Sequence, residues 1–191
     1  MKAVVLAGGR GTRLRPYTVS FPKPLVPVGD MPVLEVVLRQ LVRAGFDEVT
    51  LSVGHLASLI EAFAGDGSQW GLSIDYLRED EPLGTAGALA MLETSATEFL
   101  VMNGDVLTTI DYAELMRQHH ERGTAATAVV TRREFPVDFG VVHTDEIGDL
   151  KRWEEKPVHD HDISIGIYVL SASNLRLLNE GEARDARVPR A

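Results

Sequence analysis

Short apolar runs alternate with stretches of helical hydrophobic spacing along most of the chain. Residues 2–6 form an apolar run of strand length that ends before a glycine pair, and residues 32–44 place apolar side chains three and four positions apart before Gly45. These patterns predict a buried strand and an amphipathic helix. By the same criteria we expect strands at 48–53, 72–77, 98–102, 124–132, 139–143, 150–154 and 164–170, and helices at 55–64, 85–93, 112–122 and 172–178.

The order of these elements predicts the fold class. Strands and helices alternate over the first two thirds of the chain, which is typical of an α/β domain with a mainly parallel sheet and right-handed crossovers. Such sheets bind ligands at the carboxyl ends of their strands, close to the point where the strand order reverses. Two strand ends carry unusual residues, one after Leu6 and one after Met102, so we expect the site there.

Composition narrows the classes of protein that fit. The 191 residues are 45% hydrophobic and 25% charged, which is typical of one folded globular domain. The absence of cysteine excludes disulfide scaffolds, zinc–cysteine sites, iron–sulfur clusters and thiol catalysis. The net charge of −9 argues against a nucleic-acid-binding module, whose affinity depends on basic residues. No run approaches a membrane span, so we expect a soluble cytoplasmic protein with no membrane partner.

The loop after the first strand combines glycine and arginine. Residues 7–16 are Ala-Gly-Gly-Arg-Gly-Thr-Arg-Leu-Arg-Pro. Glycines allow a tight turn whose successive N–H groups form a nest for anions, and arginine donates bidentate hydrogen bonds to phosphate. The spacing matches neither a P-loop nor a dinucleotide-binding fingerprint. The loop therefore predicts binding of a nucleoside triphosphate, and the alternative is a plain glycine-rich turn whose Arg10, Arg13 and Arg15 face solvent.

Five motifs in order along the chain carry a resemblance to a known family. They are residues 8–16 with the Pro-Lys-Pro-Leu of 22–25, the Glu-Pro-Leu-Gly-Thr-Ala-Gly-Ala-Leu of 81–89, the Asn-Gly-Asp of 103–105, the Phe-Gly-Val-Val of 139–142 and the Glu-Lys-Pro of 155–157. Together they resemble the signature of the sugar-1-phosphate nucleotidyltransferases, and residues 78–87 are similar to the mannose-1-phosphate guanylyltransferase branch.

The resemblance implies a fold, a reaction and a set of nucleotide-binding residues. The implied fold is a Rossmann-like three-layer αβα nucleotidyltransferase fold with a mixed, mainly parallel sheet. The implied reaction is attack of a sugar-1-phosphate oxygen on the α-phosphate of a nucleoside triphosphate, with pyrophosphate leaving. A protein catalyses it mainly by aligning two anions and neutralising charge. The implied nucleotide-binding residues are Leu6, Ala7, Gly8, Gly9, Gly11, Thr12, Arg13, Glu79, Gly84, Thr85 and Ala86.

Arg13, Lys23 and Asp105 are the expected catalytic residues. By resemblance Arg13 stabilises the leaving pyrophosphate, and Lys23 bridges the α-phosphate and the attacking phosphate. Prolines on both sides of Lys23 predict a rigid, non-helical segment. The carboxylate of Asp105 suits Mg²⁺, which prefers oxygen ligands and keeps substrate phosphates and waters in its shell. The alternatives are an exposed loop lysine for Lys23 and an ordinary Asn-Gly-Asp turn for Asp105.

The sugar-phosphate side of the site is implied by Gly140, Glu155, Lys156 and Ser164. By resemblance Lys156 binds the phosphate, Glu155 contacts sugar hydroxyls, and Gly140 lets the backbone approach the sugar. The family often has Asn-Ala-Gly where this chain has Ser-Ile-Gly at 164–166, and Ser164 can still hydrogen-bond to the sugar.

Glu79 bears on the choice of base. It lies five residues before Gly84, where relatives that use uracil or thymine tend to carry glutamine. A carboxylate only accepts hydrogen bonds, and guanine presents two adjacent donors. We therefore expect GTP as the nucleotide. Thymidylyl or uridylyl transfer to glucose-1-phosphate is the alternative reaction, and a solvated Glu79 is the alternative for the residue.

Other polar and aromatic residues have simpler interpretations. The His-Asp-His-Asp of 159–162 is expected to be a polar loop rather than a metal cluster. His119 and His120 end a predicted helix, where imidazoles suit the helix dipole without any further function. Trp70 and Trp153 are expected to be packing or edge residues.

The end of the chain departs from the family pattern. The family core continues further and adds a second metal-binding aspartate, so we expect residues 1–178 to form a C-terminally shortened transferase core. Residues 179–191 have almost no apolar content and are expected to be a disordered tail. A homodimer could supply the missing side chain. The alternatives to a sugar-1-phosphate nucleotidyltransferase are a non-catalytic nucleotide-binding regulatory paralogue and a molybdenum-cofactor or other cytidylyl-type transferase on the same fold.

Overall fold

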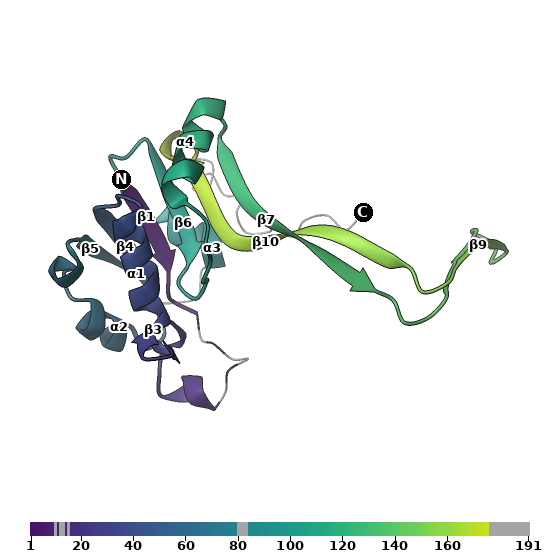
Figure 1. The fold of residues 1–191 in the computed structure, drawn as a ribbon, viewed down its shortest axis with the longest axis horizontal. Coiled ribbons are helices and arrows are strands. Elements are labelled where there is room, and N and C mark those ends of the chain that lie inside the picture. The colour runs from purple at the N-terminus through teal and green to yellow at the C-terminus, as the bar shows by residue number, and fades with distance from the viewer. Residues whose placement is uncertain (10, 12–13, 15, 80–83, 176–191) are drawn as a thin grey trace. The chain divides into compact units, whose positions relative to one another are not determined.

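The computed structural model describes residues 1–9, 11, 14, 16–79 and 84–175 (Figure 1). These residues form two compact units, one made of 1–128 with 166–175 and the other of Val129–Ile165. The predicted helix beyond residue 175 and the predicted tail at 179–191 lie outside the described residues.

The first unit is built around a mixed sheet with the strand order β5-β4-β1-β6-β10-β7. Four of its strands run parallel, with β4 and β6 on either side of β1 and β5 beyond β4. Their bounds are Lys2–Leu6 for β1, Glu48–Val53 for β4, Ser73–Arg78 for β5 and Glu98–Asn103 for β6. β10 (Val158–Ser171) pairs antiparallel with β6, and β7 (Ala126–Pro136) follows it in the sheet. The predicted α/β class with a mainly parallel sheet is confirmed.

Strand β1 lies at the centre of the core because both of its faces are covered. Val4 packs with Leu89, Phe99 and Val101 on one face. Val5, whose side chain points to the opposite face, is also fully buried. A strand that is buried on both faces has a continuous apolar run rather than an alternating one, and this is why the sequence signal for β1 was strong.

Four α-helices connect or flank these strands. They are α1 (Val33–Arg43), α2 (Ala57–Ala64), α3 (Gly84–Ala90) and α4 (Tyr112–Arg122). α1 buries the apolar stripe that predicted it, with Val33, Leu34, Val37, Leu38 and Leu41 all buried. α2 begins two residues later than expected because Leu56 has a left-handed backbone with φ 58°, which a helix cannot include. α3 ends three residues earlier than expected, in a turn where Leu92 N–H donates to Leu89 O.

Short elements complete the first unit. The strands β2 (Pro27–Val28) and β3 (Met31–Pro32) form a small hairpin. Single 3₁₀ turns lie at Tyr17–Val19, Lys23–Leu25, Ser68–Trp70 and Ala172–Asn174. The expectation of a non-helical segment at Lys23 was therefore wrong in one respect: Lys23 begins a 3₁₀ turn, because Pro24 in its second position has a φ that suits a helical turn.

The second unit, Val129–Ile165, contains an antiparallel pair of strands. These are β8 (Val141–Thr144) and β9 (Leu150–Glu154), with Val142 opposite Trp153. The polar loop expected at 159–162 was wrong, because these residues belong to β10. They are exposed, so no alternation of apolar and polar side chains could reveal the strand. Among the described residues no three His, Asp or Glu side chains come together as a metal site.

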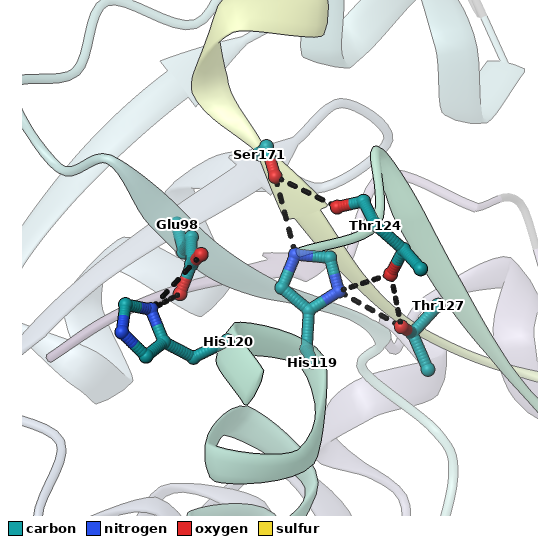
Figure 2. A network of polar contacts seen from close by, with 6 residues as sticks. All are labelled: Glu98, His119, His120, Thr124, Thr127 and Ser171. Atoms are coloured by element: carbon teal, nitrogen blue, oxygen red, sulfur yellow. Dashed lines mark hydrogen bonds and ion pairs between the residues drawn. The ribbon is translucent and has the colours of Figure 1, made fainter. Parts of the chain in front are cut away.

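A buried histidine ties the end of α4 to the sheet of the first unit (Figure 2). The ring of His119 is fully buried, with Nδ1 2.8 Å from Thr127 Oγ1 and Nε2 3.2 Å from Ser171 Oγ. Because the Ser171 hydroxyl donates to Thr124 O, it accepts from His119 Nε2, so the network assigns the ring proton to Nε2. Beside it, His120 contacts Glu98 at the start of β6, which places this network at the sheet edge opposite Asp105.

Candidate functional site

The carboxyl ends of four parallel strands meet at one edge of the first unit. Gly8 follows β1, Gly54 follows β4, Glu79 follows β5 and Asp105 follows β6. The chain passes from β1 through β4 to β5 on one side and then crosses to β6 on the other side of β1. This reversal makes the gap between the ends of β1 and β6 the switch point at which α/β sheets bind ligands.

The loops at this edge lie close enough for their backbones to form hydrogen bonds with neighbouring strands. Ala7 N–H donates to Ser52 O at 2.7 Å, and Gly104 N–H donates to Leu6 O at 2.9 Å. A Cβ at Gly8 would lie 3.3 Å from Gly54 N, and a Cβ at Gly104 would lie 3.2 Å from Leu6 O. Such distances are tighter than ordinary contacts of side chains, so these glycines allow the loops to approach one another closely.

Gly11 connects the glycine loop to Lys23. Its φ of +57° favours glycine, and its carbonyl accepts from the buried Thr18 hydroxyl at 2.7 Å. A Cβ at this position would lie 2.9 Å from Thr18 Cγ2 and 3.2 Å from Lys23 Cβ. Nothing in the sequence indicates that Thr18 belongs to this site, because only the folded loop brings its hydroxyl to the carbonyl of Gly11.

Lys23 and Asp105 form an ion pair at the switch point. Lys23 Nζ contacts Asp105 Oδ2, with 37% of the lysine side chain and 29% of the aspartate side chain exposed. The buried Pro24 and Leu25 anchor the 3₁₀ turn from which Lys23 extends. The structure thus brings together two of the three predicted catalytic side chains.

Asp105 is the residue that fits a magnesium ion. Its carboxylate is partly exposed at the sheet edge and offers the hard oxygen atoms that Mg²⁺ prefers. Mg²⁺ at phosphate-transfer sites is often bound by one or two carboxylates, with substrate phosphates and waters as its other ligands. The donor chemistry of Asp105 therefore suits the ion.

Glu79 lies against the glycine loop. It is half-buried, and its Oε1 accepts a hydrogen bond from the hydroxyl of the buried Ser52. A Cβ at Gly8 would lie 3.2 Å from this oxygen. The hydrogen bond from Ser52 thus holds Glu79 in place at the predicted nucleotide edge.

The remaining predicted nucleotide-binding residues divide into two groups. Leu6 ends β1, and Ala7, Gly8 and Gly9 continue from it, whereas the backbone of Gly84, Thr85 and Ala86 forms the first turn of α3. Arg10, Thr12, Arg13, Arg15 and residues 80–83 lie outside the described part of the chain.

In the second unit, two of the predicted sugar-side residues, Gly140 and Glu155, contact Trp153. A Cβ at Gly140 would lie 2.5 Å from Trp153 Cζ2, so only glycine leaves room for the indole ring. Trp153 Nε1–H donates to Glu155 Oε2 at 3.2 Å, and Lys156 follows with a left-handed φ of 44°. Ser164 lies in β10 of the same unit. Trp153 was expected to be a packing or edge residue, and its ring contacts both Gly140 and Glu155.

Gly166 supports the residue before the Gly104-Asp105 turn. It has φ +79°, and a Cβ there would lie 2.3 Å from Asn103 Nδ2. The amide of Asn103 thus packs on the bare Cα of Gly166, which pairs the end of β6 with β10. In the Ser-Ile-Gly segment at 164–166, the third position therefore requires a glycine, because any side chain there would clash with Asn103.

Gly166→Ala is expected to destabilise the first unit more than Gly71→Ala does. Gly71 has a nearly identical φ of +77°, and a Cβ there would meet no described heavy atom within 4 Å. Backbone strain alone costs about 1 kcal/mol, and overpacking against Asn103 adds about 1–3 kcal/mol. Thermal unfolding of both variants tests this. Equal melting temperatures would show that Asn103 moves aside without cost.

Comparisons with known proteins agree with this geometry. The family model described as "Nucleotidyl transferase" matches residues 2–187, so the chain belongs to the nucleotidyl transferase family. The mannose-1-phosphate guanylyltransferase catalytic subunit beta of Xenopus tropicalis is 39% identical over 183 residues, which are 92% of this chain and 51% of that protein. The UTP–glucose-1-phosphate uridylyltransferase of Synechocystis sp. is 33% identical over 204 residues, covering 97% of this chain and 53% of that protein.

Solved structures show the same fold. A protein from Bacillus anthracis, described as a candidate glucose-1-phosphate thymidylyltransferase, superimposes with a TM-score of 0.76 at 25% identity. The match covers 95% of this chain and 76% of that one. The Rossmann-like nucleotidyltransferase fold is therefore confirmed. The chain spans about half the length of the curated relatives described above.

None of the described helices is long and apolar enough to cross a membrane.

Proposed function

We propose that residues 1–178 form the core of a transferase that moves a nucleotidyl group from a nucleoside triphosphate to a sugar-1-phosphate. The observation that carries this proposal is the Lys23–Asp105 ion pair beside the glycine loop at the switch point of the sheet. In the reaction, a sugar-phosphate oxygen bonds to the α-phosphorus while the bond to the leaving pyrophosphate breaks. The two curated relatives described above are named a guanylyltransferase and a uridylyltransferase, and both names denote transfer of a nucleotidyl group.

The residues of the first unit suit the electrostatic demands of this reaction. Two anions must approach each other in line, which requires a fixed cation between them and backbone donors around the phosphates. Lys23 is the cation proposed to lie between the α-phosphate and the attacking phosphate. The loop from Gly8 to Thr12 is proposed to bind the phosphates through its N–H groups, and Arg13 to neutralise the leaving pyrophosphate.

Asp105 is the residue proposed to bind magnesium. When bound, Mg²⁺ would neutralise phosphate charge and orient the oxygens of the triphosphate. In the structure the carboxylate of Asp105 pairs with Lys23. We propose that this pair keeps both side chains aimed at the switch point, because Lys23 extends from an anchored 3₁₀ turn and Asp105 follows the end of β6.

The second unit is proposed to bind the sugar-1-phosphate. Lys156 is the proposed phosphate ligand and Glu155 the proposed partner of sugar hydroxyls, with Gly140 and Ser164 beside them. The indole N–H of Trp153 holds one oxygen of Glu155, which supports a defined orientation for that carboxylate.

GTP is the nucleotide that we propose. The carboxylate of Glu79 accepts hydrogen bonds and faces the glycine loop, which suits the two adjacent donors of guanine. The Xenopus relative is named a guanylyltransferase and the Synechocystis relative a uridylyltransferase, so base choice has to be measured on this chain.

A pyrophosphate-release assay tests the proposed function. The purified chain is incubated with Mg²⁺, with GTP, ATP, CTP, UTP or dTTP, and with mannose-1-phosphate or glucose-1-phosphate. We expect release with GTP and a hexose-1-phosphate, and none when either substrate is omitted. Measurable nucleotide binding without release from any pair would contradict the transferase and favour a non-catalytic nucleotide-binding module.

A further inference from the structure

Ser52 is a buried residue at the edge of the sheet where the carboxyl ends of β1, β4 and β5 lie side by side. It lies near the end of β4, opposite Leu6 of β1 and Leu77 of β5, and only 1% of the residue is exposed. Its carbonyl accepts from Ala7 N–H, the first amide after β1. The backbone of Ser52 therefore fixes the point where the glycine loop begins.

The side chain of the same residue fixes Glu79. The Ser52 hydroxyl donates to Glu79 Oε1, and Glu79 N–H donates to Val53 O at 2.9 Å. These two bonds attach both the backbone and the carboxylate of Glu79 to the end of β4. The same carboxylate oxygen would lie 3.2 Å from a Cβ at Gly8, so the carboxylate is held against the glycine loop.

Holding a flexible glutamate side chain in one geometry has a large cost in side-chain entropy. A neighbouring donor that already fixes the carboxylate reduces this cost when a ligand binds. Ser52 is suited to this task because its backbone is part of the sheet, and the hydrogen bond joins a neutral hydroxyl to a charged acceptor, which is the stronger type.

We propose that Ser52 is a positioning residue for base selection, which holds the Glu79 carboxylate where the base of the bound nucleotide is recognised. This inference rests on the proposed function and adds to it a residue that does not itself touch the nucleotide. Ser52 acts only through Glu79, so removing Ser52 matters only while Glu79 is present.

Equilibrium binding of GTP, ATP, CTP and UTP to four proteins tests the inference. The proteins are the wild type, Ser52→Ala, Glu79→Ala and the double variant. Ser52→Ala is expected to lower the ratio of GTP affinity to UTP affinity about ten-fold, since the lost bond involves a charged acceptor. The double variant is expected to have the same ratio as Glu79→Ala. Thr50→Val is the matched control, because it removes a hydroxyl from the same buried face of β4 and is expected to leave the ratio unchanged.

A second substitution separates hydrogen bonding from packing. Ser52→Cys fills nearly the same space with a weaker donor, and its selectivity is expected to fall between those of the wild type and Ser52→Ala. An unchanged ratio in Ser52→Ala, or effects of Ser52→Ala and Glu79→Ala that simply add, would overturn the inference.

The outcomes also distinguish this inference from the proposed choice of base. If the wild type prefers a nucleotide other than GTP, that choice of base is wrong, and the same cycle applied to the preferred nucleotide decides the role of Ser52. If the wild type prefers GTP and only Glu79→Ala abolishes the preference, the base assignment stands and the role of Ser52 is refuted. A wild-type chain that binds no nucleotide refutes both.

Discussion

Asp105→Asn is expected to slow nucleotidyl transfer about 1,000-fold, the magnitude typical of losing a charged group that stabilises a transition state. Asparagine has the same size as aspartate but no negative charge, so it cannot neutralise a bound cation or pair with Lys23. We expect the residual activity to require a higher Mg²⁺ concentration than the wild type. Initial rates of pyrophosphate release across a Mg²⁺ titration measure both effects.

The folded state should be affected much less than the rate. The Lys23–Asp105 pair is about one-third exposed, and partly exposed ion pairs contribute at most about 1 kcal/mol to stability. The melting temperature of Asp105→Asn should therefore stay close to that of the wild type. Asp30→Asn, an exposed carboxylate in the β2–β3 turn, is the matched control and should retain full activity. Full activity in Asp105→Asn would refute the proposed magnesium ligand.

Gly11→Ala is expected to lower the transfer rate about 100-fold, since small displacements of positioning groups have effects of this size. A methyl group would lie 2.9 Å from Thr18 Cγ2 and 3.2 Å from Lys23 Cβ. The side chain cannot be accommodated without moving the loop or the lysine. Because Lys23 contacts Asp105, a shift of its Cβ is passed to the ion pair. Steady-state kinetics of pyrophosphate release are the measurement.

Gly123→Ala controls for backbone strain in this experiment. Gly123 has φ +58°, almost the same as Gly11, and a Cβ there would meet no described heavy atom within 4 Å. Each substitution should cost about 1 kcal/mol of stability through strain. Only Gly11→Ala should also lose activity. If both variants lose activity equally, contact with Thr18 and Lys23 is not the cause.

The elements with strong patterns were predicted well from the sequence. α4 and β9 have the bounds that hydrophobic spacing indicated, and β1 and β4 have them as well. β1, β4 and α4 bury one or both faces in a core, and burial is what creates a periodic sequence signal. The residues of β9 are exposed except for the half-buried Glu154, so burial does not account for that strand. The amino-terminal half of β10 was missed because its residues 158–162 are exposed, and exposure places no constraint on the alternation of side chains.

Boundaries set by single backbone conformations were also missed. α2 starts after Leu56, a non-glycine residue with a left-handed φ. Leucine has no preference for this conformation, so nothing in its identity indicates the turn. The surrounding loop between β4 and α2 imposes it, and only the tertiary structure contains that information.

By itself, the sequence determined the class of fold, the glycine loop, and Lys23, Asp105 and Glu79 as the residues of interest. The glycine loop has a local chemical cause, and the resemblance to the sugar-1-phosphate nucleotidyltransferases implied the roles of the three side chains. Only the tertiary structure decided which partner each residue has: Asp105 for Lys23, Thr18 for Gly11, Ser52 for Glu79 and Trp153 for Glu155. The first and third of these pairs join segments far apart in the chain. Parallel pairing of β4 with β5 is the physical reason that Ser52 and Glu79 meet at one edge.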